Sequence, residues 1–107
     1  MLPKRNRVNK KGIDLIFKTG KLVISPSFTF KFIKTKFSAV QISFIVPKSV
    51  AKFAVKRNLL RRLGYRTLRK YISQFPTGIM GVFVFKKYQD NILNLENEIK
   101  NIFSKIN

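Results

Sequence analysis

The sequence predicts a single α+β domain over residues 1–107, with helices and strands in the order αβββαβα packed as a layered sandwich. Three observations support this prediction. Apolar and polar residues alternate in residues 28–34 and 40–46, as they do in half-buried strands. Apolar residues recur at the helical period in three other segments. Residues 79–85 are nearly all apolar, as in a strand that is covered on both faces.

The first helix is expected over residues 10–19. Ile13, Ile16 and Phe17 stand at positions i, i+3 and i+4 and therefore form one apolar face. Residues 1–9 are basic and contain a proline, so we expect an extended arm before this helix.

Strands follow the first helix. Residues 23–25 favour a short strand, which a proline then interrupts. The alternating segment 28–34 places Phe28, Phe30 and Phe32 on one face. An open face of this kind could stack on bases, but three alternating rings beside an amphipathic helix more often lie in a core, and we expect burial.

Residues 40–46 form the next alternating strand, and the turn at residues 34–38 suggests that it makes an antiparallel hairpin with residues 28–34. Residues 79–85 follow a loop and are expected to form a central strand. The last helix is expected to turn seven apolar residues toward the core: Ile92, Leu93, Leu95, Ile99, Ile102, Phe103 and Ile106.

A long basic helix is expected between these strands. Ser49 is a suitable N-cap, and the helix is expected to run to about Ile72. Gly64 lies inside the helix, where glycine costs about 1 kcal/mol relative to alanine, and a close packing contact would explain it. The residues expected on its apolar side are Phe53, Leu60, Leu63, Thr67 and Tyr71.

Charge gives the strongest indication of function. The chain has 23 lysines and arginines against 4 acidic residues, a formal net charge of +19. Residues 54–70 contain seven basic residues and no acid, although like charges one turn apart weaken a helix. A solvated surface helix would mix Glu with Lys, so a polyanionic partner is the better explanation. Nucleic acid is favoured over an anionic membrane surface, because no apolar run reaches the length of a membrane span.

The composition also excludes several kinds of catalytic site. The chain has no His and no Cys, so it offers no imidazole base and no thiolate metal site. Its acids are Asp14, Asp90, Glu96 and Glu98, which are too few and too scattered for two-metal phosphodiester hydrolysis. A self-contained nuclease is therefore not expected. The N-terminus has no apolar segment typical of a secretory signal, and we expect a cytoplasmic protein.

Several motifs together resemble the bacterial ribonuclease P protein subunit. Residues 54–63, Ala-Val-Lys-Arg-Asn-Leu-Leu-Arg-Arg-Leu, preceded by Ile-Val-Pro-Lys at 45–48, resemble its signature of a strand followed by a basic helix. Residues 2–8, Leu-Pro-Lys-Arg-Asn-Arg-Val, then Asp14, then Phe-Lys-Thr-Gly at 17–20, are similar to its N-terminal part. The resemblance covers essentially the whole chain.

This resemblance implies a fold similar to the second domain of ribosomal protein S5, with a left-handed βαβ crossover. It implies a protein that binds a catalytic RNA and precursor tRNA, so that the holoenzyme removes the 5′ leader. It further implies one protein per RNA, Mg²⁺ that serves the RNA subunit, and no cofactor in the protein itself. An alternative is a structural RNA-binding protein, such as a small ribosomal protein, without a substrate cleft.

The resemblance also implies two sets of site residues. The residues expected on the catalytic RNA are Lys56, Arg57, Asn58, Arg61 and Arg62, extended along the same stripe by Arg66 and Arg69. The residues expected beside the single-stranded leader are Phe17, Lys31, Lys48, Lys86 and Lys87. Three positions depart from the family's pattern. Leu59 stands where the motif usually has its second Arg, Ile13 stands near the place where the family often has a second cleft aromatic, and Lys31 stands near the place of a common Tyr. Leader binding is therefore expected to depend more on charge and less on stacking. If Phe17, Lys31 and Lys48 converge on an open groove, a second, single-stranded ligand is implied and the first function is favoured, whereas a buried Phe17 would weaken it.

Overall fold

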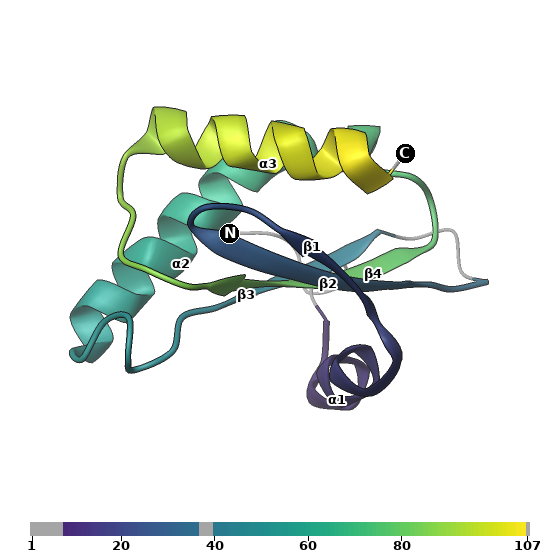
Figure 1. Cartoon of the computed structure of the whole chain (residues 1–107), viewed down its shortest axis with the longest axis horizontal. Helices are drawn as coiled ribbons and strands as arrows, with labels where there is room; N and C mark the ends of the chain where they lie inside the picture. The colour runs from purple at the N-terminus through teal and green to yellow at the C-terminus, as the bar shows by residue number, and fades with distance from the viewer. Residues whose placement is uncertain (1–7, 37–39, 107) are drawn as a thin grey trace.

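The structure is a computed structural model that describes residues 8–36 and 40–106. Its elements confirm the predicted order αβββαβα, with a short 3₁₀ helix added before the last strand (Figure 1). In chain order they are α1 (Lys10–Thr19), β1 (Lys21–Ile24), β2 (Phe28–Lys34), β3 (Gln41–Ile45), α2 (Ala54–Arg69), η2 (Ile72–Gln74), β4 (Ile79–Phe85) and α3 (Ile92–Ile106).

The four strands form one sheet in the order β1-β2-β4-β3. The predicted hairpin between β2 and β3 is wrong, because β4 lies between them, antiparallel to β2 and parallel to β3. β4 is apolar on both faces and is therefore most stable in the middle of the sheet, whereas alternation in β2 and β3 shows which face each one buries but not which partner it takes. β3, α2 and β4 make a βαβ crossover, whose expected left hand stays a prediction.

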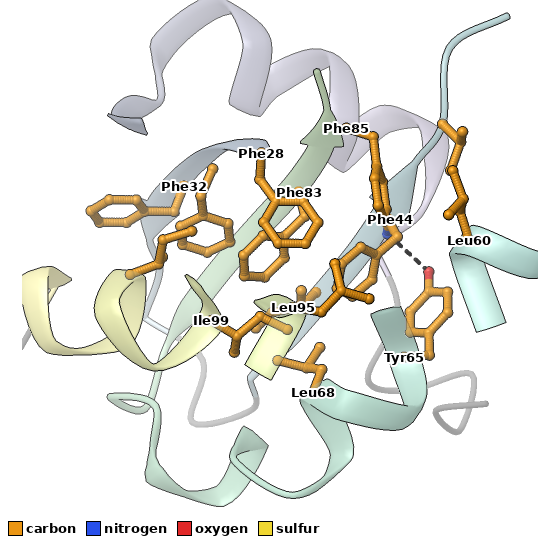
Figure 2. Close-up of a cluster of buried hydrophobic side chains, with 14 of the residues drawn as sticks. Phe28, Phe32, Phe44, Leu60, Tyr65, Leu68, Phe83, Phe85, Leu95 and Ile99 are labelled. Atoms are coloured by element: carbon orange, nitrogen blue, oxygen red, sulfur yellow. Dashed lines mark hydrogen bonds between the residues drawn. The ribbon is translucent and has the colours of Figure 1, made fainter. Parts of the chain in front are cut away.

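The main core lies between one face of the sheet and helices α2 and α3. Phe28, Phe30 and Phe32 are buried there, as predicted. They meet rings from the neighbouring strands, including the stacked pair Phe44 and Phe83, whose centroids are 4.8 Å apart. Figure 2 shows this layer of rings beside Leu68 of α2 and Leu95 and Ile99 of α3.

Gly64 allows α2 to lie directly on this core. A Cβ atom placed on Gly64 would come within 2.7 Å of the ring of Phe44. The next residue of α2, Tyr65, also contacts Phe44: its hydroxyl accepts a hydrogen bond of 3.1 Å from the Phe44 backbone N–H (Figure 2). The close packing contact that would explain a glycine inside this helix is therefore present.

A smaller core lies on the opposite face of the sheet, where α1 packs (Figure 1). Ile16 of α1 is fully buried against Val82 of β4. Val8 is also buried there, and its N–H donates a hydrogen bond of 2.8 Å to the Ser43 hydroxyl. Most of the expected N-terminal arm lies outside the described residues, but its last part is fixed to β3.

The ends of the helices differ from the predictions. Ser49 lies in a turn and does not cap α2, which begins after Phe53 and ends at Arg69 instead of Ile72. Phe53 was expected in the core but is 68% exposed. The prediction placed Phe53 in the core because the helix was expected to begin after Ser49, which would have put Phe53 on its apolar face. In α3, Ile92 and Leu93 are exposed, because they belong to the first turn, before the helix reaches the sheet.

Candidate nucleic-acid interface

The exposed side of α2 gathers a row of basic side chains. Asn58, Arg61, Arg62, Arg66 and Arg69 together line a surface hollow of about 960 Å³. The Arg61 guanidinium donates a hydrogen bond to the Asn58 side-chain oxygen. Arginine presents a planar fork of donors that suits phosphate oxygens, so this surface can hold an RNA or DNA backbone.

Two residues of the predicted set lie outside this hollow. Lys56 is exposed beside it. Arg57 is half-buried, and its Nη1 donates to the backbone oxygens of Ala51, at 3.1 Å, and Lys52, at 2.7 Å. The structure therefore gives Arg57 a positioning role in the loop before α2, in addition to its charge.

The floor of the hollow is apolar. Leu59 is half-buried and lines it together with Val55, which is 76% exposed, and Leu63. Leu59 thus occupies the same surface as the arginines that flank it. Sequence reasoning identified Leu59 as a departure from the motif but did not identify Val55, whose exposure follows from its place one turn before Leu59 on the helix.

A second candidate surface lies on the sheet face that carries α1. Phe17 of α1 is 42% exposed, and the Lys31 ammonium lies 5.4 Å from the centroid of its ring. The same ammonium donates a hydrogen bond of 3.4 Å to the backbone oxygen of Phe17. The structure thus brings Phe17 and Lys31 together on an open surface, and the contact has the geometry of a cation–π interaction.

Two apolar residues of β1 extend this surface. Leu22 is opposite Lys31 in the strand pairing, and Ile24 is opposite Thr29, so both belong to the face that carries α1. They are 50% and 60% exposed. Sequence reasoning missed them because Leu22 lies outside the strand expected at residues 23–25. Ile24 lies inside that strand, but alternation over so few residues does not show which face is buried.

The remaining predicted lysines gather at one edge of the sheet. β3 and β4 are parallel, so the segments that follow them leave at the same edge. Lys48 follows β3, Lys86 and Lys87 follow β4, and all three are exposed. Lys31 is opposite Val82 in the strand pairing. Lys86 follows Val82 by four residues, a length of about 13 Å along an extended chain at about 3.3 Å per residue. The structure therefore places this group apart from the Phe17–Lys31 pair, and it does not bring Lys48 together with Phe17 and Lys31 in one groove as the sequence analysis expected.

The acidic residues of α3 have structural contacts. Glu98 is buried, and its Oε1 accepts hydrogen bonds from the Ser25 hydroxyl at 2.5 Å and the Ser27 N–H at 2.6 Å. These bonds fix α3 to the turn between β1 and β2. Among the residues that the structure describes, no three of His, Cys, Asp or Glu lie close enough together to hold a metal ion.

Glu96 joins α3 to the end of α2. It accepts a hydrogen bond from the Tyr71 hydroxyl and lies 3.9 Å from the Lys70 ammonium and 4.0 Å from that of Lys100. The hydrogen bond from Tyr71, aided by the two ammonium groups, lowers the pKa of Glu96 below its usual 4.5. The same hydrogen bond to a carboxylate raises the pKa of Tyr71 above its usual 10.0.

None of the helices in the described ranges is long and apolar enough to cross a membrane.

The chain is similar to known proteins both in sequence pattern and in fold. A family model described as Ribonuclease P matches residues 2–107. The fold is similar to that of the RNase P protein from Thermotoga maritima, with a TM-score of 0.85 and 22% identity over 96% of this chain and 99% of that one. It is similar also to the RNase P protein of Staphylococcus aureus, with a TM-score of 0.83 and 17% identity over 97% of this chain and 100% of that one. No curated protein sequence matches the chain.

Proposed function

The chain belongs to the ribonuclease P family as a protein subunit of that holoenzyme, and on this premise we propose that its two exposed surfaces bind two different stretches of RNA. The first surface is the arginine-lined side of α2. The second is the sheet face around Phe17 and Lys31. The observation that carries the proposal is that these surfaces belong to different elements and have different chemistry.

The α2 surface is proposed to bind the catalytic RNA. Its arginines are exposed or half-exposed, and they are spaced along a helix of 16 residues. A regular row of guanidinium groups fits the regular phosphates of a folded RNA and needs no particular base sequence. The proposed contact residues are Lys56, Asn58, Arg61, Arg62, Arg66 and Arg69, with Arg57 holding the preceding loop in place.

The α1 face of the sheet is proposed to bind the 5′ leader of precursor tRNA. A single strand exposes base faces as well as phosphates, so its binding site combines apolar or aromatic platforms with cations. Phe17, Leu22 and Ile24 supply the exposed apolar part, and Lys31 supplies a cation. The lysines at the sheet edge would bind phosphates of the same RNA leader farther along its backbone; they are Lys48, Lys86 and Lys87.

Cleavage itself is proposed to take place in the RNA subunit with Mg²⁺, with no cofactor in the protein. Support comes from the full sequence, which has no His, no Cys and only 4 acidic residues. Two of those acids, Glu96 and Glu98, are engaged in contacts that hold α3. We propose one protein per RNA, acting in the cytoplasm. A structural RNA-binding protein without a substrate cleft is less well supported, because such a protein has no need to expose Phe17.

Reconstitution with the catalytic RNA at low magnesium tests this proposal. Precursor tRNA with and without a 5′ leader would be compared, and the protein is expected to raise kcat/KM mainly on the leader-bearing substrate. Phe17→Ala and Lys31→Ala should reduce that gain, whereas Lys105→Ala, which removes an exposed charge from α3, should not. An equal gain on both substrates would contradict leader binding, and no gain on either would contradict the whole proposal.

A second experiment separates the RNA-binding role of α2 from its structural role. Arg62→Ala should reduce the magnitude of the slope of log K against log salt for RNA binding by about 0.7–0.9, the range for one phosphate contact, and leave the midpoint of unfolding nearly unchanged. Arg57→Ala should lower that midpoint, because Ala51 and Lys52 lose their hydrogen-bond donor. The reverse pattern would show that the two roles are wrongly assigned.

A further inference from the structure

Phe53 stands immediately before α2 and is 68% exposed, although sequence periodicity predicts it in the core. Its neighbour Val55, in the first turn of α2, is 76% exposed. The Lys52 ammonium lies 5.9 Å from the centroid of the Phe53 ring. A large aromatic ring is thus presented to solvent at one end of the basic helix.

Position 53 departs from two rules of protein stability at once. It is the N-cap of α2, where Ser, Thr, Asp or Asn would satisfy a free backbone N–H, and Phe makes no such hydrogen bond. It also leaves most of an aromatic ring in water, where the ring contributes little to the core. A residue that is unfavourable for the local structure and is not buried is a candidate for a functional role.

The loop that carries this ring is well fixed. The N–H groups of Val50 and Ala51 both donate to the oxygen of Pro47, and Ala51 is buried. The Arg57 guanidinium then holds the oxygens of Ala51 and Lys52, the two residues directly before Phe53. Because the backbone is held on both sides, a partner that binds the ring has little loop entropy to remove.

The surroundings of the ring are cationic. Lys52 and Lys56 are exposed on either side of Phe53, and residues 48–62 contain no acidic residue to oppose an anion. An apolar protein partner would meet these lysines as unpaired charges, whereas a nucleotide supplies both a flat base for the ring and a phosphate for the lysines.

We propose that Phe53 is a stacking platform for one unpaired base of the catalytic RNA, next to the phosphates held by the arginines of α2. This inference rests on the proposed function, because it assigns a base contact to the same helix. It gives the α2 surface a second mode of recognition: the arginines read phosphate spacing, and Phe53 requires an unpaired nucleotide at one end of the contact.

The first test compares stability with RNA affinity in the Phe53→Asn variant. Asn supplies an N-cap oxygen, so the thermal midpoint of the variant should rise. Its affinity for the catalytic RNA should nevertheless fall by roughly 5- to 150-fold, the range for the loss of one stacked aromatic. Phe53→Tyr should keep the affinity. Leu93→Asn, which removes another apolar side chain that is 70% exposed, is the matched control and should leave the affinity unchanged.

The second test uses fluorescence. The chain contains no Trp, so Phe53→Trp introduces a single reporter at the proposed contact. Stacking on a base should quench its emission and protect it from iodide when the catalytic RNA is added. A Leu93→Trp reporter should show neither change.

The outcomes separate this inference from the proposed function. If wild-type protein binds and activates the catalytic RNA but Phe53→Asn binds equally well and Trp at position 53 is not quenched, only the stacking platform is overturned. An effect seen only with leader-bearing precursor tRNA would assign the ring to the leader and overturn the present assignment. An affinity that is unchanged while concentration-dependent self-association disappears would show a contact between two copies of the chain instead.

Discussion

At Gly64, one missing methyl group determines how closely α2 approaches the sheet. Glycine inside a helix costs about 1 kcal/mol relative to alanine, so this position carries a local cost. The ring of Phe44 occupies the space that a Cβ would take, at 2.7 Å. That ring is itself stacked on Phe83 and cannot retreat without disturbing its neighbour.

We expect Gly64→Ala to destabilise the protein in spite of its better helix propensity. Overpacking of a filled core typically costs about 1–3 kcal/mol, which exceeds or cancels the gain of about 1 kcal/mol from propensity. Urea unfolding followed by circular dichroism would measure the difference. In a Phe44→Leu background, the ring that clashes is gone, so Gly64→Ala should lower the free energy of unfolding by less than it does in the wild type. A single variant that is more stable than wild type would show that the ring can move.

Individual site residues differed in how far the sequence could predict them. Phe17 and Lys31 could be named from the resemblance, and the structure places them in contact on an open surface. Leu22 and Ile24 could not, because an aliphatic residue on a short strand is equally consistent with a core position. Arg57 shows the opposite difficulty: its type predicts phosphate binding, but its half-buried contacts with the preceding loop depend on where α2 begins.

At the scale of elements, α2 and α3 are joined by a polar contact at their margin. Tyr71 follows the C-terminus of α2, and its hydroxyl donates to Glu96 of α3, with Lys70 and Lys100 on either side. This contact holds the C-terminal end of α2 against α3, which covers the core. Its strength depends on the ionised form of Glu96.

The contact should make stability depend on pH in the acid range. Because the pKa of Glu96 is lower in the folded protein than its usual 4.5, its contribution is complete above that value and is lost as pH falls through the folded pKa. The difference in thermal midpoint between wild type and Glu96→Gln should therefore be largest near pH 6–7 and narrow below about pH 4.5.

Tyr71→Phe provides the matched test, because the Tyr71 hydroxyl is the largest cause of the lowered pKa of Glu96. The difference in thermal midpoint between wild type and Tyr71→Phe should also narrow below about pH 4.5. The double variant Tyr71→Phe with Glu96→Gln should have a thermal midpoint close to that of either single variant. A difference between wild type and Glu96→Gln that stays constant from pH 7 to pH 3 would contradict the role of the ionised carboxylate.

The identity of the elements was largely predictable, and their ends were not. Periodicity over residues 10–19 and 79–85 matches α1 and β4, because both segments have strong and uninterrupted patterns. The N-cap of α2 was predicted at Ser49 but lies four residues later, at Phe53, since Ser49 has the chemistry of an N-cap but lies in a turn. A capping residue predicts a helix start only if the backbone that follows is helical, and here Arg57 and Pro47 hold a loop instead.

At the scale of the whole molecule, charge opposes compactness. A net charge of +19 on a chain of 107 residues creates repulsion that the fold must overcome in the absence of a partner. Bound RNA would remove that repulsion, which couples folding stability to assembly.

We expect the thermal midpoint of the free protein to rise with ionic strength. Between 0.01 M and 0.1 M sodium chloride the Debye length falls from about 30 Å to about 10 Å, so repulsion across the molecule is largely screened. A gain of about 1 kcal/mol would raise the midpoint by about 4–8 °C in a domain of this size. Differential scanning fluorimetry would measure this rise of the midpoint with salt. In the double variant Arg62→Gln with Arg66→Gln, which has two fewer positive charges, the rise should be smaller. A midpoint that falls with salt would indicate that attractive ion pairs dominate.

Sheet order was the part of the fold that the alternation of β2 and β3 could not predict. The alternation of Phe28, Phe30 and Phe32 predicts a buried face, and the structure buries it. That pattern is the same whichever strand pairs with β2, so proximity in sequence suggested β3. The apolar character of β4 on both faces carried the correct information, since a strand of this kind needs a neighbour on each side.

The position of β4 also has a consequence for synthesis on the ribosome. β2 and β3 are joined through β4, so a nascent chain that has emerged only as far as α2 cannot yet complete the sheet. Contacts between segments far apart in the chain form late and slowly, and until they form the apolar face of α2 is not fully covered. Leu60 and Leu68 of α2 belong to the main core, which is completed only when β4 and α3 have been synthesised. The basic helix is therefore translated before the sheet that positions it, and its binding surface becomes rigid only near the end of translation.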